Sequence, residues 1–507
     1  MSYIKNMNRK IIVGIETHVQ LKTKSKMFCS CSAEYFGSKP NVNVCPVCLG
    51  YPGALPKVNE EAIVQAIRVG KLLKFENINK SSSFERKNYM YPDLFKGFQI
   101  TQYKNPILSN GYLEIRIQGN VDSHLKNTNH PKATPIPHVV SNKINIYRAH
   151  LEEDTAKSLH EDGYTLIDGN KAGVPLLEIV SAPDLDSAIE AKEYAKTLYN
   201  LLRYSNISDC DMEKGQMRFD ININLEITDD DGCTFYTPIV EVKNLNSFRS
   251  LERAINFEAD FQFEEFKKNR IEKNKGNKVT KGWNDIKGET IFQRGKEESD
   301  DYRYFPEPDL PPLVLSQKFI DSVTVENSAE NTMKKLRDAG VSGSSVSVLV
   351  LTLGLEFVHI FDQMSNEYHG DLNSLANWVI NDLAGIISEY DVDISSIDIQ
   401  KLVNILNLVS GKELTSTSAK EIIYKMIVNK ENVDKLISSR KIISDNAEID
   451  KCIDEVLGEN KDLIQTYLNG KEGLLSFFIG QVMKKMQGRA SPSDIKNKLL
   501  IKISKFR

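Results

Sequence analysis

Four prolines fall within the short segment 306–312, and they limit the possible folds more than any other feature of this sequence. Proline fixes its φ angle and has no amide hydrogen to donate, so the segment excludes helix and forms a rigid boundary. Strand patterns dominate the sequence before it, and helical patterns dominate the sequence after it. Because 507 residues are long for one domain, we expect two or three domains, the first ending near this segment.

Periodicity predicts the secondary structure on both sides of the boundary. Apolar and polar residues alternate in several runs, which is typical of half-buried strands because successive strand side chains face opposite ways. These runs cover 11–21, 112–118, 218–225 and 239–243. Helical spacing occurs at 60–73, 187–204 and 251–272, and near the C-terminus at 480–488. Ser187, with Glu190 three residues later, forms a capping-box pattern.

These patterns predict an α+β fold class. We expect a β-rich domain over residues 1–313, an all-helical domain over 314–429 and a small helical tail domain over 430–507.

Four of the seven cysteines form two closely spaced pairs, C-x-C and then C-x-x-C. Two such pairs joined by a short loop suit a tetrahedral zinc ion, and four thiolates leave no open position, so the ion would be structural. Paired thiolates and an odd cysteine count favour a reducing compartment over disulfides. The predicted ligands are Cys29, Cys31, Cys45 and Cys48.

A zinc deaminase is a poor alternative. That class needs H-x-E and P-C-x-x-C, whereas Glu16 precedes His18 here, and Val44 stands before Cys45.

Acidic residues recur on the predicted strands of the first domain. Glu16 and His18 are two residues apart on one strand and therefore share a face. A lone carboxylate on a strand is either solvated or turned inward and paired, and both interpretations stay open for any one residue. Together the acids could supply the oxygen ligands that magnesium requires. They are Glu16, Glu152, Glu153, Asp154, Glu178 and Glu241.

Charge and missing motifs exclude several function classes. The net charge of −4 excludes a chain that is basic throughout, although residues 480–507 carry eight basic side chains and one acid. Such a stretch suits phosphate contacts, or it is a solvated helix end. No apolar run is long enough to span a membrane and no signal-peptide pattern is evident, so we expect a cytoplasmic protein of bacterial type, with an organellar matrix or stroma not excluded. The sequence lacks the phosphate-loop and dinucleotide motifs and a glutaminase Cys-His-Glu set.

Ten blocks of the sequence resemble the GatB family, the B subunits of the glutamyl/aspartyl-tRNA(Gln/Asn) amidotransferases. No single block is a common motif, and together they cover essentially the whole chain in order. The blocks are VGIETHVQL, MFCSC, NVCPVCLGYPGALP, FERKNYMYPD, RAHLEEDTAKS, GVPLLEIVSAPD, MRFDININL, VEVKNLNSF, DDYRYFPEPDLPPL and FFIGQVMKKMQGRASP.

The resemblance implies a cradle-like catalytic domain and a ligase activity that forms carbon–nitrogen bonds. Family members use ATP to phosphorylate the side-chain carboxylate of Glu-tRNA(Gln) or Asp-tRNA(Asn), and ammonia then displaces phosphate to give the amide. A partner amidase subunit releases the ammonia from glutamine, and a small third subunit makes the complex a heterotrimer. The expected ligands are therefore ATP, Mg²⁺, structural Zn²⁺ and misacylated tRNA.

The resemblance also implies roles for individual residues. Glu16, His18, Glu153, Glu178 and Glu241 fall on the family's magnesium positions, and Glu152 could exchange roles with Glu153. Further residues in matching blocks are Lys87, which could steer phosphate or ammonia, Arg218 and Asp220, and, in the tRNA-binding tail, Lys484, Lys485 and Arg489.

Two other functions remain as alternatives. A non-catalytic, zinc-bearing RNA-binding or assembly protein would explain the cysteines and the basic tail but not the acids. A hydrolytic zinc enzyme would need an open zinc position. The sequence does not indicate which of the two tRNAs is used.

Overall fold

The computed structural model contains two compact units, Met1–Ser328 and Ala329–Arg507. It describes residues 7–119, 138–295, 302–325, 328–390, 392–440, 446–468, 471, 473–486, 490 and 492–504.

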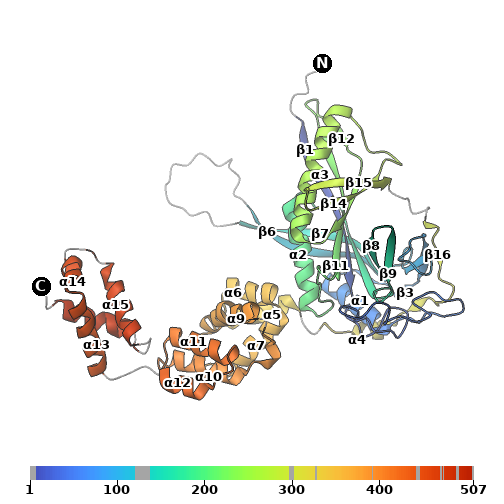
Figure 1. Cartoon of the computed structure of the whole chain (residues 1–507). Coiled ribbons are helices and arrows are strands. Elements are labelled where there is room, and N and C mark those ends of the chain that lie inside the picture. Colours follow the sequence, from blue (N-terminus) through green and yellow to red (C-terminus); the bar gives the residue numbers. More distant parts are fainter. Residues whose placement is uncertain are drawn as a thin grey trace. The chain divides into compact units, whose positions relative to one another are not determined.

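A ten-stranded sheet forms the centre of the first unit (Figure 1). Its strands run in the order β15-β14-β13-β11-β1-β10-β7-β6-β2, with β12 on β11. Neighbours are antiparallel except β13 and β14, which are parallel. The bounds are β1 (Asn8–Gln20), β2 (Asn77–Ile78), β6 (Leu108–Gly119), β7 (His138–Glu153), β10 (Pro175–Ser181), β11 (Met217–Thr228), β12 (Thr234–Tyr236), β13 (Val240–Leu245), β14 (Val279–Asn284) and β15 (Glu289–Gly295).

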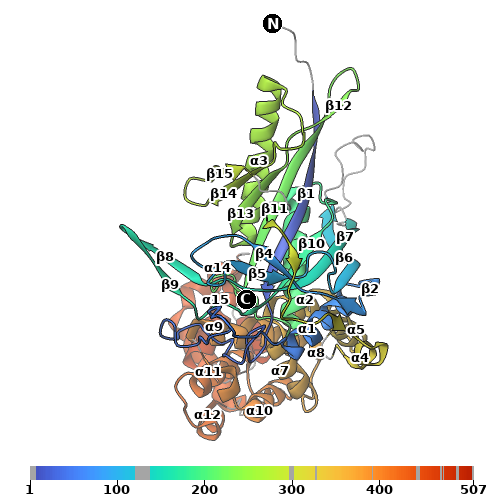
Figure 2. The same ribbon diagram turned by 90° about the vertical axis from the view of Figure 1, so that its right-hand side faces the viewer.

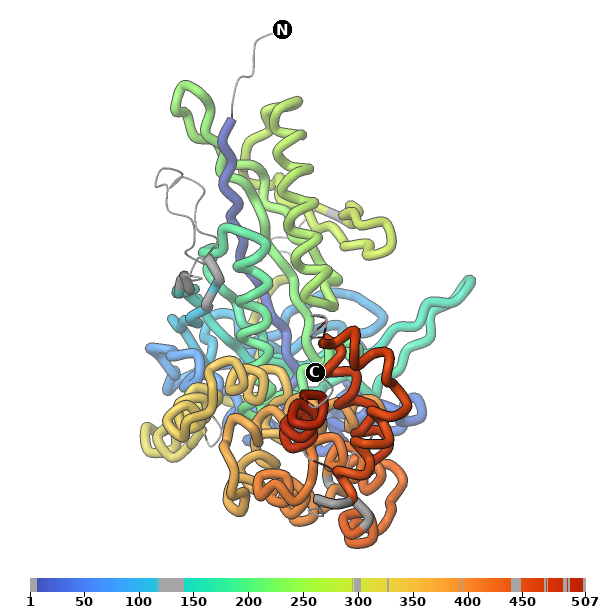
Figure 3. Tube along the Cα trace, turned by 90° about the vertical axis from the view of Figure 1, so that its left-hand side faces the viewer, coloured from blue at the N-terminus to red at the C-terminus, as the bar shows by residue number. Residues whose placement is uncertain are grey.

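Strand alternation gives the sheet one apolar and one polar face. Helices α2 (Ala188–Tyr204) and α3 (Phe248–Asn269) lie side by side over the apolar face (Figures 1 and 3). Helix α1 (Glu60–Leu72) joins the same hydrophobic core. The sheet's fully buried contribution to this core includes Val13, Ile15, Val19, Leu151, Leu177, Ile179, Phe219, Ile221 and Val242.

Small sheets surround the polar face. Strands β4 (Glu85–Asn88) and β5 (Phe98–Thr101) form one with β16 (Phe305–Pro306), and β5 packs against β7 (Figure 2). Strand β3 (Ser81–Ser82) pairs with β17 (Leu313–Val314). The hairpin of β8 (Lys157–Glu161) and β9 (Tyr164–Asp168) projects from this region.

Helices make up the described part of the second unit. They are α5 (Ala329–Asp338), α6 (Gly343–Ser347), η2 (Val348–Leu353), α7 (Leu355–Ser365), α8 (Leu372–Asn377), η3 (Trp378–Leu383), α9 (Ala384–Tyr390), η4 (Ile394–Ser396), α10 (Ile399–Ser410), α11 (Ser416–Ile427), α12 (Val433–Arg440), α13 (Asn446–Glu459), α14 (Lys461–Leu468), α15 (Leu474–Lys485) and α16 (Pro492–Ile503). The last four share a core of their own. No described helix, including α4 (Gln317–Ser322), is long and apolar enough to cross a membrane.

The predicted α+β class is confirmed. Ser187 caps α2 as expected, because its side chain accepts from the Glu190 amide. The reciprocal half of the capping box differs: the Glu190 carboxylate accepts from the amide of Asp186, not from that of Ser187. The C-terminal end of the helix predicted at 480–488 lies outside the described residues.

The proline-rich segment belongs to the first unit. Strands β16 and β17, which flank it, pair with β4 and β3. The compact units divide between Ser328 and Ala329. The finer division into three domains at residues 313 and 429 stays a prediction.

Candidate active site and metal centre

A row of polar side chains crosses four strands on the face opposite α2 and α3. His18 of β1 lies opposite Glu178 of β10 on one side and Arg218 of β11 on the other. Glu178 lies in turn opposite His150 of β7. Directly paired residues share a face of the sheet, so strands far apart in the sequence bring these four side chains together.

His18, Glu152 and Glu178 form a group that could hold a metal ion. Their ligand atoms all lie within 4.8 Å of one another. His18 Nε2 is 3.3 Å from Glu178 Oε2. Glu152 follows His150 by two residues on β7, and its Oε1 is 3.2 Å from His150 Nε2. Carboxylate oxygens suit a hard cation such as Mg²⁺, for which imidazole is a minority ligand.

Charges around Glu178 hold its carboxylate in the ionised form that a metal ligand needs. Burial by itself would raise the pKa of Glu178, but His150 and His18 outweigh that effect and hold it well below the usual range. Burial likewise would lower the pKa of His18, yet its hydrogen bond to Glu178 produces a net rise. Among the described residues, His18 Nδ1 has no hydrogen-bond partner, so Nε2 is the nitrogen directed at the carboxylates. The donor set therefore fits a divalent cation.

Side chains from β5 hold Glu152 from the other side. Gln99 Nε2 donates to Glu152 Oε2 over 3.1 Å, and Thr101 Oγ1 donates to Glu152 Oε1 over 2.6 Å. Because each carboxylate oxygen is hydrogen-bonded, the orientation of the group is fixed.

A second acidic group lies on neighbouring strands of the same face. Glu16 is opposite Asp220, and its Oε1 accepts from Asn222 Nδ2 over 2.8 Å. Lys243 Nζ is 2.9 Å from Asp220 Oδ2 and 3.3 Å from Glu241 Oε1. Burial would lower the pKa of Lys243, but Asp220 and Glu241 produce a net rise. The ammonium is therefore a fixed positive charge among these acids.

Arg218 is held by a buried carboxylate at the edge of the cluster. Asp154 Oδ1 lies 2.9 Å from Lys171 Nζ and 3.5 Å from Arg218 Nη1, while Asp154 Oδ2 accepts from Gln20 Nε2 over 2.8 Å. Burial alone would raise the pKa of Asp154, but the two cations and the amide donor lower it well below the usual range. Asp154 thus keeps Arg218 charged and oriented on the polar face.

Glu153 makes a separate set of contacts. Its Oε1 pairs with Lys96 Nζ and accepts from the Ile100 amide over 3.0 Å. In the part of the chain that the structure describes, Glu16, Glu153 and Glu241 belong to neither group of close metal-ligand atoms. Their place in the magnesium ligand set stays a prediction.

Lys87 lies between aromatic rings near the cluster. Its Nζ is 4.9 Å from the ring centre of Tyr302 and 5.6 Å from that of Tyr89. Its positive charge contributes to the lowered pKa of both Glu152 and Glu178, which burial and, for Glu152, the neighbouring Glu178 would otherwise raise. The Lys87 ammonium can therefore interact with a negatively charged group that binds at the metal-ligand group.

A pocket of about 300 Å³ opens on the same face beside Glu16. Tyr147 and Tyr236 contribute aromatic rings, Asn222 and Asn224 contribute amides, and Lys273 contributes an ammonium. Mostly apolar walls with a few polar groups are typical of small-molecule sites. The remaining lining residues are Ile12, Gly14, Ile15, Val180, Ser181, Pro183 and Ile239.

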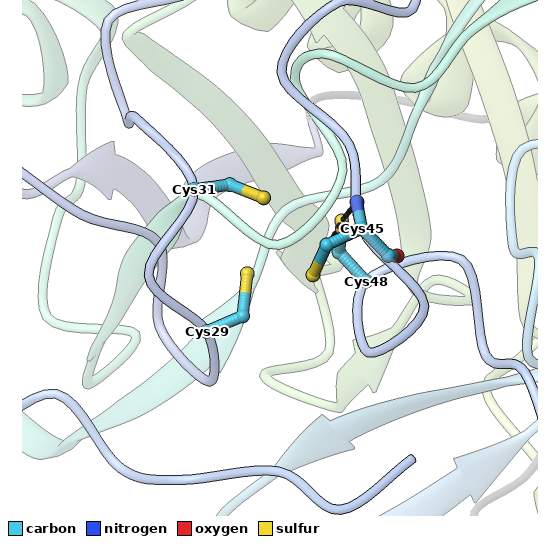
Figure 4. A group of neighbouring side chains, drawn as sticks. All are labelled: Cys29, Cys31, Cys45 and Cys48. Carbon is cyan, nitrogen blue, oxygen red and sulfur yellow. Dashed lines mark hydrogen bonds between the residues drawn. The ribbon is translucent and has the colours of Figure 1, made fainter.

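The four predicted zinc ligands converge within the first unit. Cys29 and Cys31 lie on one loop and Cys45 and Cys48 on another, with their sulfurs directed at a common space (Figure 4). All four sulfurs lie within 4.8 Å of one another, and Cys45 Sγ and Cys48 Sγ are 3.9 Å apart. Tetrahedral Zn–S bonds of about 2.3 Å require sulfurs about 3.8 Å apart. The cysteines are free, and they fit a closed zinc site.

The four sulfurs are close enough to influence one another's protonation. A hydrogen bond from Cys29 lowers the pKa of Cys48 to about 4 and raises that of Cys29. Burial, with a hydrogen bond to Cys45, raises the pKa of Cys31 to about 11. The fully buried Lys26 brings its ammonium within 3.7 Å of Cys48 Sγ and donates to the carbonyls of Asn43 and Gly169.

The sequence of this chain matches two models of known protein families. A model described as the GatB/GatE catalytic domain matches residues 11–321, and one described as the GatB domain matches residues 359–503. The chain belongs to the GatB family.

Relatives cover almost its whole length. The protein named as the B subunit of aspartyl/glutamyl-tRNA(Asn/Gln) amidotransferase in Treponema denticola is 38% identical, covering 98% of this chain and 99% of the relative. Those of Persephonella marina and Campylobacter jejuni, with the same name, are 36% and 37% identical; each match covers 97% of this chain and 99% of the relative.

The matched GatB domain includes the predicted tRNA-binding residues of the tail. Lys485 is paired within the tail, since its Nζ is 2.7 Å from Glu459 Oε1 and 3.4 Å from Glu455 Oε2. Lys484 has no ion pair among the residues described. Arg489 lies outside the described residues.

His150 was not predicted to belong to the candidate site, although the acids beside it were. The signal was present: in Ala149-His150-Leu151-Glu152, apolar and polar residues alternate, which assigns His150 and Glu152 to one face of a strand. Gln99, Thr101 and Lys243 carried no comparable signal. The packing of β5 against β7 brings Gln99 and Thr101 to the site, and the pairing of β13 with β11 brings Lys243.

Proposed function

We propose that this chain is the activating component of a tRNA-dependent amidotransferase. It phosphorylates the side-chain carboxylate of Glu-tRNA(Gln) or Asp-tRNA(Asn) with ATP and converts it to the amide. The names of the relatives and the matched catalytic domain support this function. The observation that carries it is the buried group of His18, Glu152 and Glu178 on the polar face of the sheet. The catalytic match disfavours a non-catalytic assembly protein.

The proposed reaction has two balanced steps. A carboxylate oxygen of the aminoacyl group attacks the γ-phosphorus of ATP, the bond to the β-phosphate oxygen breaks, and ADP leaves. Ammonia then attacks the acyl carbon, the C–O bond to phosphate breaks, and nitrogen loses a proton to give the amide. Phosphoryl transfer needs mainly positioning and charge neutralisation.

The residues of the polar face supply both requirements. We assign His18, Glu152 and Glu178 as magnesium ligands, with Glu16, Glu153 and Glu241 as further candidates. Bound Mg²⁺ would neutralise phosphate oxygens. Lys87 and Arg218 add fixed positive charge beside this group, and the Lys243–Asp220 pair lies on the neighbouring strands.

The pocket beside Glu16 is the proposed place for the adenosine of ATP. Tyr147 and Tyr236 can stack on a base, and the amides of Asn222 and Asn224 can hydrogen-bond to it. Because Asn222 also donates to Glu16, a base bound there would lie next to the second acidic group.

The ammonia must come from a partner, since the sequence lacks a glutaminase set. We propose a partner amidase as its source and a small third protein as the remaining member of a heterotrimer. In this scheme the complex is a ligase that forms carbon–nitrogen bonds with glutamine as amide donor, and it works in the cytoplasm. The four cysteines would hold zinc for structure.

The test uses the complex reconstituted with both partners and offers each misacylated tRNA separately. We expect Mg²⁺-dependent ATP cleavage only with a misacylated tRNA, and an at least 100-fold loss (about 2.7 kcal/mol in the barrier) in Glu178→Gln. Glu161→Gln, an exposed acid on β8, is the matched control and should retain wild-type activity. ATP cleavage that survives in Glu178→Gln would refute the assignment of the site.

A second measurement tests the other predicted ligands. If Glu16→Ala combined with Glu153→Ala leaves activated-ester formation undiminished, these two residues act outside the metal site.

A further inference from the structure

His150 is a buried histidine that the proposed reaction does not use. Its side chain is 3% exposed and lies on the polar face of β7, directly opposite Glu178 of β10. Burying an imidazole costs free energy unless its nitrogens make polar contacts, so the contacts of His150 indicate the role of this residue.

One ring nitrogen lies between the two carboxylates of the metal-ligand group, at hydrogen-bond distance from Glu152 and slightly farther from Glu178. His150 Nε2 is 3.2 Å from Glu152 Oε1 and 3.6 Å from Glu178 Oε2. Glu178 therefore has an imidazole on each side, with His18 Nε2 at 3.3 Å from the same oxygen. His150 is not a member of the ligand group of His18, Glu152 and Glu178, but its Nε2 contacts both carboxylates of that group.

The other ring nitrogen shows which atom carries the proton. His150 Nδ1 is buried and has no hydrogen-bond partner among the residues described. A proton on Nδ1 alone would leave a buried N–H unpaired and would turn the Nε2 lone pair toward two carboxylates. Hydrogen bonding therefore favours the ring with its hydrogen on Nε2, where it is donated to Glu152 Oε1 and also faces Glu178 Oε2.

Without that donor the two carboxylates would face each other directly. Glu152 Oε1 and Glu178 Oε2 lie 3.2 Å and 3.6 Å from the same nitrogen. Gln99 donates to Glu152 Oε2 and Thr101 donates to Glu152 Oε1, so this carboxylate cannot turn away from Glu178 without breaking those hydrogen bonds.

We infer that His150 is a positioning residue that holds Glu152 and Glu178 together, with their oxygens directed at a divalent cation shared with His18. This inference rests on the proposed function, and it assigns His150 a hydrogen-bond donor role outside the ligand set. Such residues typically contribute about 10- to 100-fold to metal affinity.

The test measures Mn²⁺ binding to the full-length chain by electron paramagnetic resonance, with Mn²⁺ as the probe for Mg²⁺. We expect His150→Phe, which keeps a ring but removes the donor, to weaken binding about 10- to 100-fold. His150→Gln keeps an N–H donor and should recover most of that loss. The matched control is His160→Phe on the exposed hairpin strand β8, which should bind like wild type.

The outcomes separate the two claims. Equal Mn²⁺ affinity in His150→Phe and wild type, with binding lost in Glu178→Gln, would overturn the role of His150 and leave the metal site standing. Unchanged affinity in Glu178→Gln as well would overturn the proposed site itself. If His150→Phe fails to fold by circular dichroism, His150→Gln compared with His150→Ala decides, and equal affinity in those two also overturns the inference.

Discussion

At the scale of single residues, this molecule keeps several carboxylates charged although they are buried. Asp154 is the clearest case, because Lys171, Arg218 and Gln20 together outweigh its burial. Removing one member of a buried ion pair leaves the others uncompensated, which costs far more than losing a pair at the surface.

We therefore expect Asp154→Asn to lower the stability of the first unit by about 3–5 kcal/mol. Urea unfolding can be followed by the fluorescence of Trp283 in a chain carrying Trp378→Phe, since the protein has two tryptophans. The control is Asp209→Asn, which breaks the exposed Lys22 pair and should cost about 0–1 kcal/mol. Equal losses in both variants would contradict the role given to Asp154.

The same carboxylate predicts a pH dependence. Its pKa is lowered in the folded state, so its stabilisation is complete above the unfolded value of about 3.9 and is lost as pH falls below it. The stability difference between wild type and Asp154→Asn should thus be constant from about pH 5 to 7 and shrink at lower pH. A difference that grows on acidification would be inconsistent with this assignment.

At the scale of elements, local patterns predicted the strands but not their partners. The alternation at 218–225 corresponds to β11 and that at 11–21 to β1. The pairing of His18 with Glu178 and Arg218 joins residues 160 and 200 positions apart, and no local pattern encodes it. The contact of Gln99 with Glu152 depends on the packing of the small sheet that contains β5 against β7, which no local pattern encodes either.

The two cysteine loops contain turns and an isolated β-bridge but no helix or strand, so we expect zinc to stabilise them. Cys45→Ser should abolish zinc binding, measured by metal analysis of the purified chain, and lower the thermal unfolding temperature. Cys233→Ser, at an exposed cysteine, is the control and should change neither. Catalysis lost while zinc content and unfolding temperature stay at wild-type values would contradict a structural role.

At the scale of the whole molecule, the last four helices have a hydrophobic core separate from that of the sheet. Several lysines of these helices form ion pairs with acidic residues of α13, including Lys485, Lys498 and Lys502. If this part of the chain binds tRNA, the lysines without such pairs should contribute most.

We expect Lys484→Glu to weaken tRNA binding and to reduce the slope of log affinity against log salt by about one unit. Lys485→Glu should have a smaller effect, because its wild-type charge is already offset by Glu455 and Glu459. Filter binding across a salt series measures both. A larger effect of Lys485→Glu would contradict this interpretation.

The central place of β1 has a consequence for the synthesis of the protein. Both of its neighbours, β10 and β11, are synthesised more than 150 residues after it. At about 5–20 residues per second, roughly 10–40 s pass before those partners exist. For that time an apolar strand has no sheet to join, so the nascent chain needs protection from aggregation before its active site can form.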